Sequence, residues 1–258
     1  MFVILESVNQ ALYSSSDGVS SYVNTTLQPP EVSILVKYKD AYYNKNILDI
    51  GCGAGRTSHY FRNFTDQYTG VDYSPGMIEH CVRHYPGLTF KHCDVRDLSC
   101  FDDGEFDFVM FSYNGIDYID HHGRMKALAD INRVLNPGGL FVFSAHNRQY
   151  KNIMTTPSLA AALNPVRMAK NIVSYAQQIK NRRELSKQEV DDDHYAILND
   201  SGNNFALLTY YIDKIKQTEQ LVSTGFKVLE MYKLNGQRLL PGEDDSGDCW
   251  IYYVCKRV

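Results

Sequence analysis

Between Asn46 and Ala145 the sequence repeats one pattern, in which a short apolar run is followed by a turn and then by a helical window. The apolar runs read NILDI, YTGVDY, LTFKHCDV, FDFVMFSY and GLFVFSA. The helical windows between them span Arg56 to Phe64, Ser74 to His84 and Arg124 to Leu135. Short apolar runs that alternate with helices are typical of a parallel sheet covered on both faces. The pattern therefore predicts an α/β fold with a mostly parallel, doubly wound sheet.

The rest of the chain is expected to add to this core rather than to form a second domain. Residues 1–44 are polar and Tyr-rich and are expected to form an N-terminal helical cap, and residues 45–147 form the core. Residues 148–206 read as an inserted helical lid, with two helices separated at Asn164-Pro165 and an acidic, turn-rich end. Residues 207–258 read as a helix from Tyr211 to Thr224 and two strands that complete the sheet, so we expect one catalytic domain overall.

Composition and charge exclude several classes of protein. The chain of 258 residues is 44% hydrophobic and carries a net charge of −4, so it has no general positive field for nucleic acid or an anionic membrane. Its six cysteines form no C-x-x-C pair, and the pair His121-His122 has no partner at ligand spacing, so no metal site is predicted. No signal peptide or membrane-spanning run is recognised. A cytoplasmic protein with reduced thiols is the expectation.

The stretch NILDIGCGAGRTSHYF places Gly51, Gly53 and Gly55 directly after the first apolar run. A dinucleotide site requires G-x-G-x-x-G, and here the third glycine is one residue early. Asp49 lies two residues before the first glycine, where a carboxylate would repel a pyrophosphate but suits an ammonium or sulfonium group. S-adenosylmethionine (SAM) carries both groups and no phosphate. The charge pattern favours SAM over NAD, and an NAD-dependent reductase is the less favoured alternative.

Later strand ends supply further residues for such a nucleoside. Asp72 ends the second run, 21 residues after Gly51, where a carboxylate can accept hydrogen bonds from both ribose hydroxyls. Asp94 can accept from the adenine amino group while the Val95 N–H donates to a ring nitrogen, with Asp97 as the alternative to Asp94. Tyr73 can stack on adenine. Met77 can lie beneath it, or can be an ordinary core residue.

The five blocks LDIGCGAG, GVDYSPGMI, CDVRDL, FDFVMFSYNGIDYI and RVLNPGGLFVFS resemble, in order and spacing, the class I SAM-dependent methyltransferases, and the tail LVSTGFKVLE…WIYYVCK resembles their last helix and hairpin. The resemblance implies a seven-stranded sheet with an antiparallel last strand, SAM across the tips of the first two strands, and a small-molecule acceptor beyond the fourth. The residues expected to bind the cofactor are Asp49, Gly51, Cys52, Gly53, Gly55, Arg56, Asp72, Tyr73, Met77, Asp94, Val95, Phe111 and Ser112.

The expected reaction is an in-line transfer of the SAM methyl group to a nitrogen or oxygen atom of a small molecule, which leaves S-adenosylhomocysteine. A base is needed only if the acceptor is protonated. His146 after the fifth strand is the first candidate for this base, or else a turn histidine that bonds to backbone; Asp117 is the second, and Tyr113 flanks the methionine part. The oligomeric state is not indicated.

Two alternative functions remain open at this point. An RNA or protein methyltransferase could use the basic stretch 167–187, although the NPPY motif of many nucleic-acid relatives is replaced by SYNG. A non-catalytic SAM-binding module would keep the glycine turn but fill the acceptor side with bulky residues.

Overall fold

The computed structural model describes residues 26–258. Most of the expected N-terminal cap lies outside the described residues. The helices are α3 (Pro29–Lys37), α4 (Arg56–Phe61), α5 (Pro75–His84), α6 (His121–Val134), α7 (Pro165–Leu185) and α8 (Lys214–Ser223), with 3₁₀ turns at Lys39–Ala41, Gly115–Tyr118, Ser186–Gln188 and Gly202–Phe205. No helix within 26–258 is both long and apolar enough to cross a membrane.

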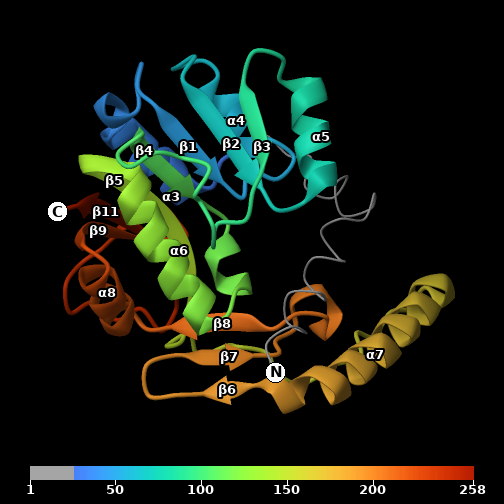
Figure 1. Cartoon of the computed structure of the whole chain (residues 1–258). Helices are drawn as coiled ribbons and strands as arrows, with labels where there is room; N and C mark the ends of the chain where they lie inside the picture. Colours follow the sequence, from blue (N-terminus) through green and yellow to red (C-terminus); the bar gives the residue numbers. More distant parts are fainter. Residues whose placement is uncertain (1–25) are drawn as a thin grey trace.

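The strands form a single mixed sheet (Figure 1). They are β1 (Ile47–Ile50), β2 (Tyr68–Asp72), β3 (Thr89–His92), β4 (Phe106–Phe111), β5 (Leu135–Asn147), β6 (Val190–Asp191), β7 (Ala196–Leu198), β8 (Thr209–Ile212), β9 (Phe226–Lys233), β10 (Arg238–Leu239) and β11 (Trp250–Arg257). Strands β3, β2, β1, β4 and β5 lie side by side and parallel, and β11 runs antiparallel between β5 and β9. The predicted α/β fold, mostly parallel with an antiparallel last strand, is confirmed.

Four short strands extend the predicted seven to a sheet of eleven. The strand β10 pairs with β9 in the loop between the last two long strands. The hairpin β6–β7 pairs with β8, and β8 in turn pairs in parallel with the last two residues of β5, where His146 faces Tyr211 in the register. This small branch joins the inserted segment to the strand that carries His146.

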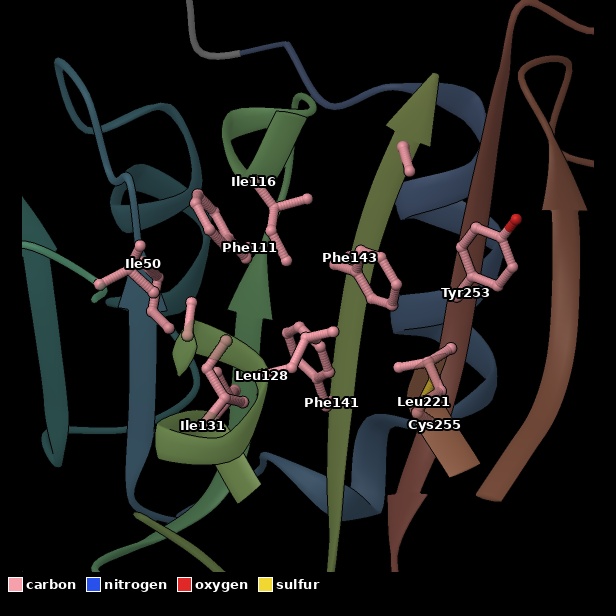
Figure 2. Close-up of a cluster of buried hydrophobic side chains, with 14 of the residues drawn as sticks. Ile50, Phe111, Ile116, Leu128, Ile131, Phe141, Phe143, Leu221, Tyr253 and Cys255 are labelled. Atoms are coloured by element: carbon pink, nitrogen blue, oxygen red, sulfur yellow. The ribbon is translucent and has the colours of Figure 1, made fainter. Parts of the chain in front are cut away.

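The two faces of the sheet bury separate apolar clusters. On one face Phe141 and Phe143 of β5 stack at 4.7 Å and pack against helices α6 and α8 (Figure 2). On the other face Ile34 of α3 and Phe61 of α4 pack against β1 and β4. Burying each large side chain contributes about 1.5–3 kcal/mol to folding. Because both faces are covered, the strand tips at the carboxyl edge are the natural place for a ligand.

The inserted segment differs from the prediction in two places. Only one of its two expected helices forms: residues 157–163 contain no helix, and the single helix begins at Pro165. The stretch expected to be acidic and turn-rich forms the hairpin β6–β7, because Ala196 and Ile197 are buried against the sheet. Helix α7 begins after Asn164, whose side chain accepts hydrogen bonds from the Val166 and Arg167 N–H groups.

The helix expected from Tyr211 to Thr224 is shorter than predicted. Tyr211 lies in β8, and α8 begins after Asp213, whose carboxylate accepts from the Ile215 and Lys216 N–H groups. Helix α6 begins three residues before the predicted start, after Asp120, whose carboxylate accepts from the Gly123 N–H. An aspartate at the N-cap position therefore marks the start of a helix more reliably than the end of an apolar pattern does.

Candidate active site at the carboxyl edge of the sheet

The glycine turn after β1 is shaped by two glycines and leaves space above the third. Gly51 and Gly55 have φ values of +63° and +90°. A Cβ atom would lie 3.0 Å from the Phe111 ring at Gly51 and 2.2 Å from the Tyr85 ring at Gly55, so neither position accepts a side chain. At Gly53 the only atom of residues 26–258 near such a Cβ is the Gly51 carbonyl oxygen, at 4.0 Å. A ligand can therefore approach the backbone at Gly53.

Asp72 at the end of β2 is held against this turn. Its two carboxylate oxygens accept hydrogen bonds from the Gly53 N–H at 2.9 Å and from the Ser74 N–H at 2.8 Å. Burial raises the pKa of Asp72. A carboxylate has about four acceptor positions, so each oxygen keeps one for a further donor such as a hydroxyl group. Asp72 is placed as the sequence predicts for a residue that binds a ribose.

Asp49 lies under the turn rather than beside the open space. Its carboxylate is 1% exposed and accepts from the Thr57 hydroxyl at 2.5 Å and the Tyr68 hydroxyl at 2.6 Å. Burial raises the pKa of Asp49 to about 6. The structure thus brings Asp49 to the predicted strand but turns its side chain inward, where it acts on a ligand as a buried charge and not through direct contact.

Buried, sulfur-containing side chains lie beneath the glycine turn. Cys52 and Met77 are 4% and 3% exposed, and the Cys81 thiol donates to the Gly53 carbonyl oxygen at 3.1 Å. A hydrogen bond with Cys81 and burial keep the pKa of Cys52 well above its usual range. Cys52 and Met77 therefore support the turn from the core side.

Arg56, the first residue of α4, is paired with an acid that the sequence analysis missed. Its two terminal nitrogens bond to the Glu31 carboxylate at 2.5 and 2.7 Å, and its guanidinium lies 5.0 Å from the centre of the Tyr113 ring. The Ser112 hydroxyl also donates to Glu31, which is fully buried. This pair ties α3 to the glycine turn. The capping box between Gln28 and Glu31 is a local signal for the helix start, but nothing in it indicates Arg56.

The end of β3 places Asp94 and Val95 one strand beyond Asp72. The Asp94 carboxylate is bonded to the Arg96 guanidinium at 2.5 and 2.9 Å. Val95 is buried, and its N–H donates no backbone hydrogen bond within residues 26–258. Asp97 accepts from the Ser99 N–H. Tyr73, half-buried after β2, accepts from His92 through its carbonyl oxygen. Among the described residues the Val95 N–H has no acceptor, so it is available to the edge of a base.

The segment after β4 turns sharply beside the glycine turn. Phe111 packs against Gly51, and both Tyr113 and Asn114 have left-handed φ values of +60° and +58°. Tyr113 is 43% exposed and contacts the Trp250 ring at 5.4 Å. The Asn114 side chain is 1% exposed, and neither of its amide atoms has a hydrogen-bond partner in the described part of the chain. A buried amide without partners is costly, which favours a polar ligand or water at this place.

The structure brings the two predicted base candidates, Asp117 and His146, together. The His146 Nδ1 lies 2.8 Å from Oδ2 of Asp117, and the His146 backbone N–H donates to the same oxygen at 2.6 Å. The other carboxylate oxygen of Asp117 accepts from Arg124 at 2.6 Å. Arg124 is fully buried and also donates to Gln217 at 2.5 Å. Nε2 of His146 makes no hydrogen bond in the described part of the chain.

Arg124 and Gln217 were missed by the sequence analysis. Arg124 belongs to a window with otherwise helical periodicity, and a single Arg in such a window usually lies on the solvated face. Its partner Gln217 is 93 positions away, so no local pattern connects the two. Among residues 26–258 there is no group of three or more His, Cys, Asp or Glu side chains that could hold a metal ion.

Comparison with known proteins agrees with this geometry. Residues 47–139 match the family described as a methyltransferase domain. A probable phthiotriol/phenolphthiotriol dimycocerosates methyltransferase 2 of Mycobacterium ulcerans is 32% identical over 105 residues, which are 39% of each chain. A fatty-acid O-methyltransferase of Mycolicibacterium smegmatis is 34% identical over 113 residues, 41% of this chain and 39% of that protein. Across the curated relatives, the match covers between 39% and 60% of their length.

Solved structures share the fold over nearly the whole chain. The 1,6-didemethyltoxoflavin-N1-methyltransferase of Burkholderia thailandensis, crystallised with its substrate and S-adenosylhomocysteine, superposes with a TM-score of 0.62. It is 15% identical, and the superposition covers 98% of this chain and 88% of that one. The family match shows that residues 47–139 form a methyltransferase domain, and the strand order and the shared fold show that the chain has the class I, Rossmann-like fold of SAM-dependent methyltransferases.

Proposed function

We propose that this chain binds SAM at the tips of β1 and β2 and transfers its methyl group to a nitrogen or oxygen atom of a small molecule held near His146. The observation that carries the proposal is the arrangement of three neighbouring strands. The open glycine turn ends β1, and the His146–Asp117 pair lies at the ends of β4 and β5. Neighbouring strands are about 4.8 Å apart, so the two features face one another across about 10 Å.

The residues present fit this cofactor. The backbone at Gly53 is open, Asp72 has acceptor positions left for a diol, and the Val95 N–H is available for a base edge. The amide of Asn114 supplies a further unpaired donor and acceptor beside the turn. When bound, SAM supplies an activated methyl group on a sulfonium, so the protein mainly aligns the two reactants and excludes water.

His146 is proposed as the base for an acceptor that carries a proton. The Asp117 carboxylate accepts from Nδ1–H and so fixes the tautomer in which Nε2 keeps its lone pair. The acceptor heteroatom, held within reach of Nε2, would receive the methyl group that bound SAM would supply from its sulfonium. The proton released by the acceptor passes to Nε2, and the charge that develops on the imidazole is stabilised by Asp117.

The acceptor class follows from the same pair and from the relatives. A base is useful for an alcohol, a phenol or a protonated amine and unnecessary for a carboxylate. The relatives include enzymes named for a fatty acid and for a nitrogen heterocycle, and either class is small enough for a site at the strand tips. A non-catalytic SAM-binding module is disfavoured because His146 and Asp117 are arranged as a general base, which binding alone does not require.

The test begins with binding and then measures turnover. Isothermal calorimetry with SAM, S-adenosylhomocysteine and NADH should show binding of the first two only. S-adenosylhomocysteine release is then followed with long-chain hydroxy compounds, phenols, fatty acids and nitrogen heterocycles as acceptors. Binding of NADH without binding of S-adenosylhomocysteine would refute the proposal, whereas SAM binding without turnover on any class would support the non-catalytic module.

A further inference from the structure

The long helix α7 has its polar side against the protein and its apolar side in solvent. Side chains of Asn171, Ser174, Gln178 and Asn181 bond to the body of the insertion, at Ala160, Asn204 and Ser158. The opposite side carries Val166, Ala169, Val173, Ala176 and Ile179, all of them exposed. We call these five residues the α7 stripe. A surface helix of a globular protein normally shows the reverse arrangement, with the apolar side buried.

Exposed apolar residues are concentrated in this part of the molecule. Of the seventeen large hydrophobic side chains that are exposed in the described part of the chain, seven lie between residues 154 and 179. These seven are Met154, Leu159, Leu163, Val166, Ile172, Val173 and Ile179. Leu163, just before the helix, is completely exposed, and Val173 is 70% exposed. Single exposed apolar residues are ordinary, but a gathered set of this kind marks an interaction surface.

The α7 stripe is flanked by positive charge. Between residues 165 and 187 there are six basic side chains and one acidic one, in a chain whose net charge is −4. Five of the six form no ion pair with any residue of 26–258, since only Arg182 is paired, with Glu189. These five are Arg167, Lys170, Lys180, Arg183 and Lys187. An apolar stripe with basic flanks is the pattern of a helix that lies in the interface of an anionic membrane.

We propose that α7 seats this protein on an anionic lipid surface. A second copy of the chain is a poorer occupant, because a symmetric pairing of α7 with itself would bring five unpaired cations on each side together with only Glu184 to offset them. A nucleic acid would use the cations and leave the apolar stripe in water. Of these three occupants, only a lipid surface satisfies both halves of the pattern.

The position of α7 connects this surface to the proposed acceptor site. The helix extends away from the sheet beyond β7 and β8 (Figure 1), and β8 pairs with β5 at His146. Its 21 residues give a contact about 30 Å long. If the proposed function holds, a surface-bound enzyme would take its acceptor from the lipid phase, which points to an amphiphilic acceptor with its reactive group at the head.

The test is cosedimentation of the full chain with vesicles, without cofactor or acceptor. Vesicles of phosphatidylcholine mixed with phosphatidylglycerol should bind the protein, vesicles of phosphatidylcholine alone should bind it much less, and added salt should release it. Val173→Glu should weaken binding about tenfold, because it places a charge in the stripe. The pair Lys170→Glu and Lys180→Glu should weaken it at least thirtyfold, since each lost cation is worth about fivefold.

Matched controls keep these outcomes specific. Val222→Glu changes an equally exposed valine on α8, and Lys227→Glu with Lys256→Glu reverses two exposed cations that face one another on β9 and β11. Neither control should change vesicle binding. Equal loss in the α7 variants and the controls, or no binding to either kind of vesicle, would overturn the proposal.

Two further measurements separate the other occupants. If sedimentation velocity without lipid shows a dimer that Val173→Glu dissociates, the stripe belongs to a second copy instead. If single-stranded RNA is retained, and only the lysine variants release it, the surface is a nucleic-acid site. Calorimetry of SAM with Val173→Glu should match wild type, so a failure of lipid binding is not confused with a failure of the proposed methyl transfer.

Discussion

The proposed cofactor side and the proposed acceptor side of this molecule are built in different ways. On the cofactor side, between β1 and β3, the important groups are backbone N–H groups, glycines and one acid at each strand end, all within 47–95. On the acceptor side, Asp117 and His146 are 29 positions apart and are held by Arg124 and by Gln217 of α8. The first site follows from short stretches of chain, and the second exists only when distant elements meet.

This difference predicts which substitutions affect binding and which affect turnover or stability. Substitutions on the cofactor side should change the affinity for SAM. Those on the acceptor side should leave that affinity unchanged and alter the rate or the stability of the fold. The following four predictions, from the largest expected effect to the smallest, test this separation.

His146→Ala should lower turnover on a hydroxyl or ammonium acceptor by about 10²–10⁴-fold, because general-base catalysis contributes about that much. The SAM affinity measured by calorimetry should not change. His194→Ala, which removes an exposed histidine of the hairpin turn, is the control. Unchanged turnover on such an acceptor would exclude His146 as the base. With a carboxylate acceptor, which has no proton to lose, the same substitution should change turnover only slightly.

Arg124→Met should destabilise the fold by about 3–5 kcal/mol in urea unfolding, because it leaves the buried Asp117 carboxylate without its cation. Adding Asp117→Asn should restore part of that loss, since the double variant no longer holds an unpaired buried charge. Strictly additive effects of the two substitutions would show that the pair does not act as a unit.

Asp72→Ala should weaken SAM binding by about 10–100-fold, as expected for the loss of hydrogen bonds to a charged group. The mutant should keep its unfolding midpoint within a few degrees of wild type, because Asp72 bonds only to the turn backbone. Asp66→Ala changes an exposed aspartate just before β2 and serves as the control. Equal SAM affinity for Asp72→Ala and wild type would remove the ribose assignment.

Asp49→Asn tests the buried charge under the glycine turn. Burial raises the pKa of Asp49 in the folded chain to about 6 from a usual value of 3.8, so the folded state binds a proton more tightly than the unfolded state. That contribution to stability is complete below pH about 4 and is lost as the pH rises through about 6.

The asparagine variant should lack this loss, and at pH 7 it should melt at a higher temperature than wild type. Melting curves across pH 4 to 7, with Asp66→Asn as control, check this expectation. Parallel curves for Asp49→Asn and wild type would contradict it. SAM affinity is measured in the same variant, because the buried charge lies close beneath the proposed cofactor site.

The sequence analysis identified the fold and the cofactor edge from local signals. Two signals depend only on neighbouring residues in the sequence: an acid directly after a buried strand, and a glycine between a strand and a helix. Asp72 and Gly53 could therefore be placed without a structure. The inward turn of Asp49 could not, because it depends on the hydroxyl of Tyr68, which comes from the next strand. The pairing of Arg56 with Glu31 was missed for the same reason.

The amino-acid sequence by itself determined the class of fold and the glycine turn proposed to face the cofactor, because alternating periodicity and glycine positions are properties of short segments. It also showed that α7 has an apolar stripe, as the spacing of Val166, Ala169 and Val173 indicates. Only the tertiary structure decided that this stripe faces solvent and that His146 meets Asp117. Both outcomes depend on contacts between segments far apart in the chain, and a local sequence pattern does not predict the energies of such contacts.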